Sequence, residues 1–81
     1  MQAKHISELF ETKDQFIASV LYACGQNFGS SEWRNSACYF QFENPEKCRQ
    51  IVSDYYRGEL KVDAKKLFDA LQTIKGIIYG K

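Results

Sequence analysis

The sequence predicts a small single α+β domain in which the elements follow in the order β-α-β-β-α-α. Three observations carry this prediction: an alternating apolar segment near residues 38–43, apolar stripes of helical period on either side of it, and capping residues at the helix ends. We expect the strands to form one antiparallel sheet, with the helices packed on one of its faces.

Length and composition are those of one globular domain that spans residues 1–81, of which we expect 1–4 to be disordered. Apolar residues make up 44% of the chain and aromatic residues 15%, enough for a core without a metal or disulfide. The net charge is only +1, which argues against a dedicated nucleic-acid binder. Residues 1–43 carry three basic and five acidic side chains, whereas residues 44–81 carry eight basic and five acidic ones.

The N-terminal part contains one ambiguous segment and one clear helix. Residues 5–11 fit either a short strand or a frayed helical turn. Residues 12–15, Thr-Lys-Asp-Gln, have the form of a capping box with Thr12 as the N-cap, and they predict a helix over about 13–24 that ends at Gly25. The apolar stripe of this helix consists of Phe16, Ile17, Val20, Leu21 and Cys24.

The middle of the chain, residues 26–43, changes to period two and predicts an antiparallel hairpin. The most favourable turn is Arg34-Asn35-Ser36. In the second arm Cys38, Phe40 and Phe42 point to one face, which we expect to be buried, while Tyr39 points to the other. Gly29 and the two serines after it indicate either a bulge in the first arm or a late start of that strand.

Two further helices have clear boundaries. Asn44 is the expected N-cap of the second helix, Pro45 its first residue and Gly58 its end. Asp63 is the expected N-cap of the third helix, which should pack against the second helix and the sheet. The second stripe comprises Cys48, Ile51, Val52, Tyr55 and Tyr56, and the third comprises Ala64, Leu67, Phe68, Leu71, Ile74 and Ile78.

Several segments resemble a family of uncharacterised domains. They are Thr12-Lys13-Asp14 leading into Ala18-Ser19-Val20-Leu21, then residues 40–43 and 55–62, and finally Phe68-Asp69-Ala70-Leu71 with Ile74-Lys75. Together they are similar to a small prokaryotic and phage family, domain of unknown function 5659. The resemblance covers nearly the whole chain but departs in the first hairpin arm. It implies the fold and transfers no activity.

No catalytic or metal-binding constellation is present in the sequence, so we expect a non-enzymatic protein without cofactor, metal or small-molecule substrate. The three cysteines, Cys24, Cys38 and Cys48, have neither disulfide nor zinc spacing and are interpreted as buried, reduced thiols. Cys48 is the best nucleophile candidate because it lies near a helix N-terminus. His5 has no positioned partner. Asp54, Asp63 and Asp69 are explained as solvated or capping groups.

Compartment and membrane association are also constrained by the sequence. Reduced thiols favour a cytoplasmic location. The first residues lack the apolar run of a signal peptide, and no segment approaches the ~18 apolar residues of a membrane span. We therefore expect a cytoplasmic protein without membrane contact.

Two features exceed what folding requires. The first is an excess of aromatic residues, among which Trp33 and Tyr39 on the hairpin are the expected partner-binding residues, with Tyr39 exposed beside Trp33. The second is a weak basic cluster whose members could contact phosphates: Arg57, Lys61, Lys65 and Lys66. The leading hypothesis is an interaction module that binds a protein partner or a second copy of itself. The alternative is a nucleic-acid-binding accessory protein.

Overall fold

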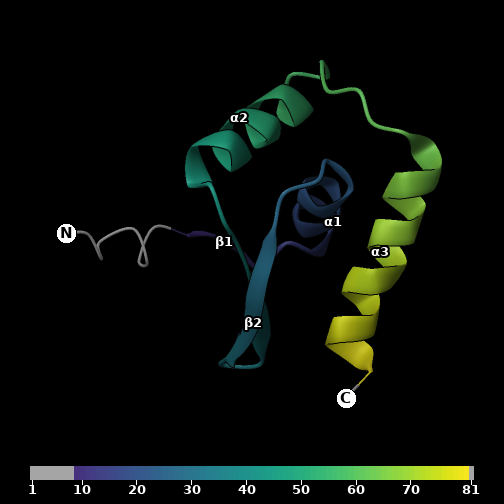
Figure 1. Cartoon of the computed structure of the whole chain (residues 1–81). Helices are drawn as coiled ribbons and strands as arrows, with labels where there is room; N and C mark the ends of the chain where they lie inside the picture. The colour runs from purple at the N-terminus through teal and green to yellow at the C-terminus, as the bar shows by residue number, and fades with distance from the viewer. Residues whose placement is uncertain (1–8, 81) are drawn as a thin grey trace.

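The computed structural model describes residues 9–80, which fold in the expected β-α-β-β-α-α order (Figure 1). The elements are β1 (Phe10–Thr12), α1 (Gln15–Ala23), β2 (Phe28–Arg34), β3 (Ala37–Phe42), α2 (Pro45–Tyr56) and α3 (Ala64–Tyr79). Within the ambiguous segment 5–11, residues 10 and 11 belong to a strand. The expectations for residues 1–4 and 5–8 fall outside the described residues.

The three strands form one antiparallel sheet in the order β1-β3-β2, so β3 is central. The predicted hairpin turn is confirmed, because Asn35 (φ 51°) and Ser36 (φ 70°) both adopt the left-handed conformation that closes a tight hairpin. The predicted bulge is also confirmed, since the register of β2 against β3 shifts between Phe28 and Ser30.

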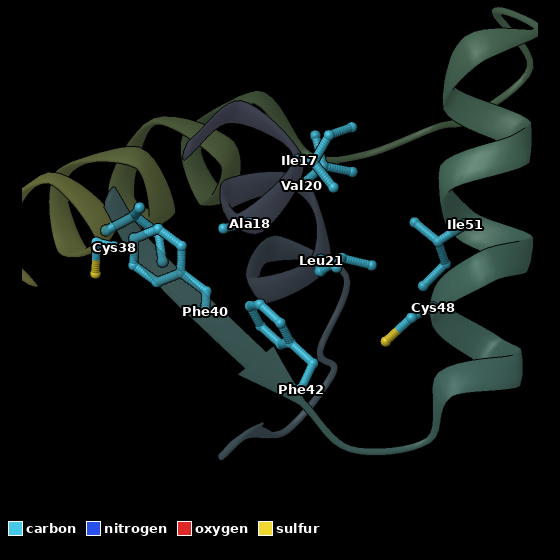
Figure 2. Close-up of a cluster of buried hydrophobic side chains, with 10 residues drawn as sticks. Ile17, Ala18, Val20, Leu21, Cys38, Phe40, Phe42, Cys48 and Ile51 are labelled. Atoms are coloured by element: carbon cyan, nitrogen blue, oxygen red, sulfur yellow. The ribbon is translucent and has the colours of Figure 1, made fainter. Parts of the chain in front are cut away.

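The core lies between the sheet and the helices. Phe40 and Phe42 of β3 are fully buried, as the alternation predicts, and they pack against α1 (Figure 2). On the other side of α1, Cys48 and Ile51 of α2 point toward Leu21 (Figure 2). The helix α1 is thereby covered on several sides, and the cluster is completed by Ile17, Ala18, Val20, Cys38 and Ile74.

The start of α1 differs from the prediction. Asp14, not Thr12, is the N-cap: its Oδ1 accepts hydrogen bonds from the amides of Phe16 (2.8 Å) and Ile17 (3.2 Å). Thr12 still has a local role, because its Oγ1 accepts from the amide of Asp14 at 3.1 Å. Because Thr12 lies in β1 and pairs with Phe40 of β3, it stays in the strand, and Asp14 caps the helix instead.

The remaining helix boundaries are confirmed. Asn44 caps α2 by accepting from the amide of Lys47, and Pro45 follows as its first residue. After α2, Gly58 has a φ of 73°, and its amide donates to the carbonyl of Tyr55 at 3.0 Å. Asp63 caps α3 through its Oδ2, which accepts from the amide of Lys66 at 3.2 Å.

The position of α3 corrects the expected packing. Its main neighbour is α1 rather than α2, and α2 and α3 lie on opposite sides of α1 (Figure 1). Ile74 of α3 still joins the core cluster that contains Phe40 of the sheet. Without α2 beside α3, part of the predicted α3 stripe stays open, and Phe68 is 64% exposed. Other stripe residues are exposed as well: Phe16, Tyr55, Tyr56 and Ala64.

Candidate interaction surfaces

The two aromatic residues expected to form a partner site on the hairpin lie on opposite faces of the sheet. Trp33 is directly opposite Cys38, whereas Tyr39 is directly opposite Glu32. Because residues paired directly across two strands point to the same face, Trp33 shares the helix-covered face with Cys38 and Tyr39 shares the open face with Glu32. The expectation that Tyr39 lies beside Trp33 is therefore wrong. Trp33 is 45% exposed and Tyr39 is half-buried.

The open face of the sheet carries a connected set of polar side chains, which we call the polar sheet cluster. The guanidinium of Arg34 pairs with Glu11 and, at 3.2 Å, with Glu32. The amide nitrogen of Gln41 donates to Glu11 at 2.8 Å. The cluster comprises Glu11, Ser30, Glu32, Arg34, Tyr39 and Gln41.

The polar sheet cluster satisfies most of its own charges. Hydrogen bonds from Gln41 and then Arg34 lower the pKa of Glu11, and the same contact with Glu11 raises the pKa of Arg34. The Arg34 guanidinium also lies 4.2 Å from the centroid of the Tyr39 ring. The ring face of Tyr39 is therefore engaged by a cation of its own chain, which makes it a poor platform for a partner or a base.

The four basic residues expected to contact phosphate divide into two pairs. Arg57 is held 2.9 Å from Asp54 and 3.1 Å from Glu59, and Lys65 lies 3.0 Å from Asp69. Lys61 and Lys66 form no ion pair with any described residue. Two of the four expected cations thus remain without a carboxylate partner among residues 9–80.

The surroundings of the candidate nucleophile, Cys48, are those of a core residue. Cys48 is fully buried and its thiol donates to the carbonyl of Glu43 at 3.4 Å, while burial raises its pKa. A raised pKa leaves less of the reactive thiolate, so a helix N-terminus does not activate this sulfur. Among residues 9–80, no three His, Cys, Asp or Glu side chains gather as a metal site would require. His5 lies outside the described residues.

A surface that the sequence did not indicate lies where the three helices meet, and we call it the helical groove. It encloses a cavity of about 250 Å³ with α1 on one side and the start of α3 on the other. The side chain of Tyr55, from the last turn of α2, closes it at one end. Its lining residues are Phe16, Ser19, Val20, Tyr55, Leu67, Phe68 and Leu71.

The aromatic residues of the helical groove are unusually open. Phe16 is 55% exposed, Phe68 64% and Tyr55 40%. Tyr56, which follows Tyr55, is 70% exposed, and the two rings pack edge-on with their centroids 5.2 Å apart. With about 200 Å² for each aromatic side chain, the three lining rings, Phe16, Tyr55 and Phe68, leave roughly 320 Å² of aromatic surface uncovered. Patches of about 300–600 Å² are the largest on typical monomers and are often functional.

A second hollow adjoins the helical groove along α3. It has a volume of about 330 Å³ and is lined by Phe68, Leu71, Gln72 and Lys75. Phe68 and Leu71 line both hollows, so the two adjoin, and the second hollow adds the polar side chains of Gln72 and Lys75. Lys75 makes no ion pair with any residue from 9 to 80, so its charge has no partner from the described chain.

The helical groove was hidden in the sequence because its residues fit the predicted core stripes. One signal was available, however. Phe16 and Ile17 are neighbours on one helix, as are Leu67 and Phe68 on another, and neighbouring helical residues point about 100° apart. One helix packed alongside covers only one residue of each pair. Burial of the aromatic ring of the pair therefore requires a second packed element. Within the described chain α3 packs mainly on α1, and α2 reaches this surface through Tyr55, so both rings stay more than half exposed.

Comparison with known proteins agrees with the resemblance of the sequence and adds no activity. Between Leu9 and Gly80, no helix combines the length and apolar character needed to cross a membrane. No curated protein and no solved structure matches the chain. One family model does match, over residues 7–80, which is nearly the full length. On that match the chain belongs to the family described as Domain of unknown function (DUF5659).

Proposed function

We propose that this domain is a non-enzymatic protein-interaction module whose helical groove binds a partner protein. The observation that supports the proposal is the exposure of Phe16 (55%) and Phe68 (64%) on either side of an apolar cavity. The same chain buries Phe40 and Phe42 completely, so it has a core in which large aromatic rings are covered. Aromatic side chains left open around a hollow are typical of the anchor points of protein interfaces.

The lining of the helical groove favours apolar side chains over a small molecule as its occupant, because ligand pockets add several precisely placed polar groups to their apolar walls. Its only hydroxyl besides Tyr55 is that of Ser19, which donates to the carbonyl of Gln15 at 2.7 Å. The groove thus offers apolar contact with little polar chemistry, and one or two apolar side chains of a protein would fill it.

Self-association is the second form of the same hypothesis, and it uses Trp33. The strand β2 is an edge of the sheet, so its outer side has no strand next to it among residues 9–80. Trp33 lies on this edge strand and is 45% exposed. An edge strand of seven residues is a template for pairing with another copy.

Cross-linking at defined positions tests the proposed groove. A photoreactive phenylalanine at position 68 should capture a partner in cells that produce the protein. The same residue at position 73 is the matched control, because Thr73 is exposed on another side of the same helix and lines neither the groove nor the hollow beside it. Adducts from position 68 and none from position 73 support the proposal. Equal adducts from both positions, or none from either, would contradict it.

Nucleic-acid binding remains the alternative, and Lys61 and Lys66 are the observation that favours it. Their charges are unpaired within the described chain, and a phosphate backbone would neutralise them. The test is a titration with single- and double-stranded DNA and RNA at low salt. Affinity that falls steeply with salt and is reduced in Lys61→Gln and Lys66→Gln would support this function, whereas a flat titration would exclude it.

We further propose that the module acts in the cytoplasm. Cys38 and Cys48 are buried, Cys24 is half-buried, and burial raises the pKa of both Cys24 and Cys48. Thiols used as small core residues suit a reducing compartment. Fractionation of cells that produce the protein, with detection by antibody, tests this location.

A further inference from the structure

We infer that the partner of the helical groove is an acidic amphipathic helix, with a carboxylate that pairs with Lys75. This inference rests on the proposed function and specifies the chemistry of its partner. Three observations carry it: the continuity of the groove with the hollow at Lys75, the unpaired charge of that lysine, and the helical spacing of the α3 side chains.

A partner helix that lies along α3 over both hollows meets Lys75. Phe68, Leu71 and Lys75 follow at spacings of three and four residues, so they lie along one side of α3. Leu71 and Phe68 line both hollows, and Lys75 lines the second. A partner that covers the two apolar side chains therefore approaches the ammonium group as well. Removing an unpaired charge from water is costly unless the partner supplies an opposite charge.

Among the other charges near the helical groove, Lys66 is unpaired within residues 9–80 but lines neither hollow, whereas Arg57 and Lys65 have counter-ions. At the α2 end, next to Tyr55, Arg57 is held between Asp54 and Glu59. On α3 itself, Lys65 is paired with Asp69. Lys75 is thus the charge that lines the groove surface without a partner from residues 9–80, and complementarity calls for an acidic group opposite it.

The geometry of the surface matches a helix better than an extended peptide. All lining side chains come from helices, and no strand edge borders the groove along which an extended chain could pair. With a rise of 1.5 Å per residue, Phe68 and Lys75 are about 10 Å apart along α3. A partner helix therefore needs an apolar anchor for the cavity and an acidic residue one or two turns away.

The helices of a second copy do not offer this combination. The helix α1, Gln15–Ala23, contains no acidic residue, and the one in α3, Asp69, is already paired with Lys65. In α2, Asp54 is already paired with Arg57, and Glu46 precedes the exposed Tyr55 by nine residues, which places the two on opposite sides of that helix. A different protein chain, one with an acidic apolar helix, is therefore the occupant.

Selection from a displayed library of helical peptides tests this inference even though the natural partner is unidentified. The library is selected against the wild-type domain, Lys75→Glu, Phe68→Ser and the control Lys47→Glu, which lies in the first turn of α2, far from Tyr55. Circular dichroism confirms that each variant is folded. We expect wild type and Lys47→Glu to enrich peptides with apolar residues three or four apart and an Asp or Glu one or two turns away.

The variants then separate the inference from the proposed function. Selection against Lys75→Glu should replace the acidic residue by Lys or Arg at the same position, and Phe68→Ser should lower binding of the enriched peptides at least tenfold. Peptides that depend on Phe68 but show no charge preference, or no helical spacing, would overturn the inference and leave the proposed function intact. If no Phe68-dependent peptide is enriched and the domain stays monomeric, both the inference and the proposed function are overturned. If sedimentation instead shows a dimer that depends on Phe68, only the inference of an acidic partner helix is overturned.

Discussion

The guanidinium carbon of Arg34 lies 4.2 Å from the centroid of the Tyr39 ring, on the open face of the sheet. The same guanidinium pairs with Glu11 from β1 and with Glu32 from its own strand. One exposed cation thereby connects side chains from all three strands. The ring of Tyr39 is thus in contact with a cation of its own chain. The aromatic rings of the helical groove have no such contact from this cluster and form the more open aromatic surface.

The contacts of Glu11 predict a loss of stability in acid. Hydrogen bonds from Gln41 and Arg34 lower the pKa of Glu11 below its ordinary value of 4.5 in the folded protein. A lowered pKa means that the contribution of Glu11 is fully present above pH 4.5 and is lost as the pH falls through the folded value. Urea titrations at neutral pH and below pH 4.5 should therefore show a smaller acid-induced loss in Glu11→Gln than in wild type.

Glu46→Gln is a suitable control for that measurement, since Glu46 makes no ion pair within residues 9–80. Its acid-induced loss should resemble that of wild type. An identical acid dependence in wild type and Glu11→Gln would show that the polar sheet cluster contributes nothing measurable to stability.

Two phenylalanines should differ sharply in their importance for folding. Phe40 is fully buried between the sheet and α1, so Phe40→Ala should lower the free energy of unfolding by about 3–5 kcal/mol. Phe68 is 64% exposed, and Phe68→Ser should change the free energy of unfolding by no more than about 0.5 kcal/mol. Chemical denaturation of the two variants checks this. A large loss in Phe68→Ser would mean that this ring stabilises the fold and is not held open for a partner.

Replacement of two glycines by alanine should change the stability of the domain in opposite directions. Gly76 lies inside α3 with nothing within 4 Å of an added Cβ, so Gly76→Ala should stabilise the domain by up to about 1 kcal/mol. Gly58 ends α2 with a φ of 73°, which disfavours any side chain, and Gly58→Ala should destabilise it by about 1–2 kcal/mol. Thermal unfolding of both variants measures the difference. Shifts of the melting temperature in the same direction would contradict this assignment.

Local chemistry explains why the helix ends and the hairpin could be predicted from the sequence. Asn44, Gly58 and Asp63 act through bonds to backbone groups a few residues away, so their roles do not depend on the rest of the fold. The error at Thr12 has a tertiary cause. Pairing of β1 with β3 holds Thr12 in the strand, and the cap moves to Asp14.

The candidate surfaces depend on tertiary arrangement and could be predicted only in part. The face of Trp33 follows from its pairing with Cys38, and the bulge after Phe28 makes that register hard to derive from alternation alone. The helical groove depends on α3 packing mainly on α1 and not on α2, which the apolar stripes do not reveal. Phe16 and Phe68 therefore fitted the pattern of core residues although both are more than half exposed.

The edge position of β2 predicts that Trp33 contributes to self-association of the domain. Sedimentation velocity over a range of concentrations should show a dimer in wild type, and Trp33→Ala should weaken it while circular dichroism and unfolding remain nearly unchanged, because Trp33 is 45% exposed. Tyr39→Ala should have a smaller effect, since the ring contacts Arg34 of its own chain. Phe68→Ser is the control that separates the edge from the groove, and it should leave an edge-paired dimer intact. Monomers at every concentration, or a dimer that Phe68→Ser disrupts and Trp33→Ala does not, would exclude pairing through β2.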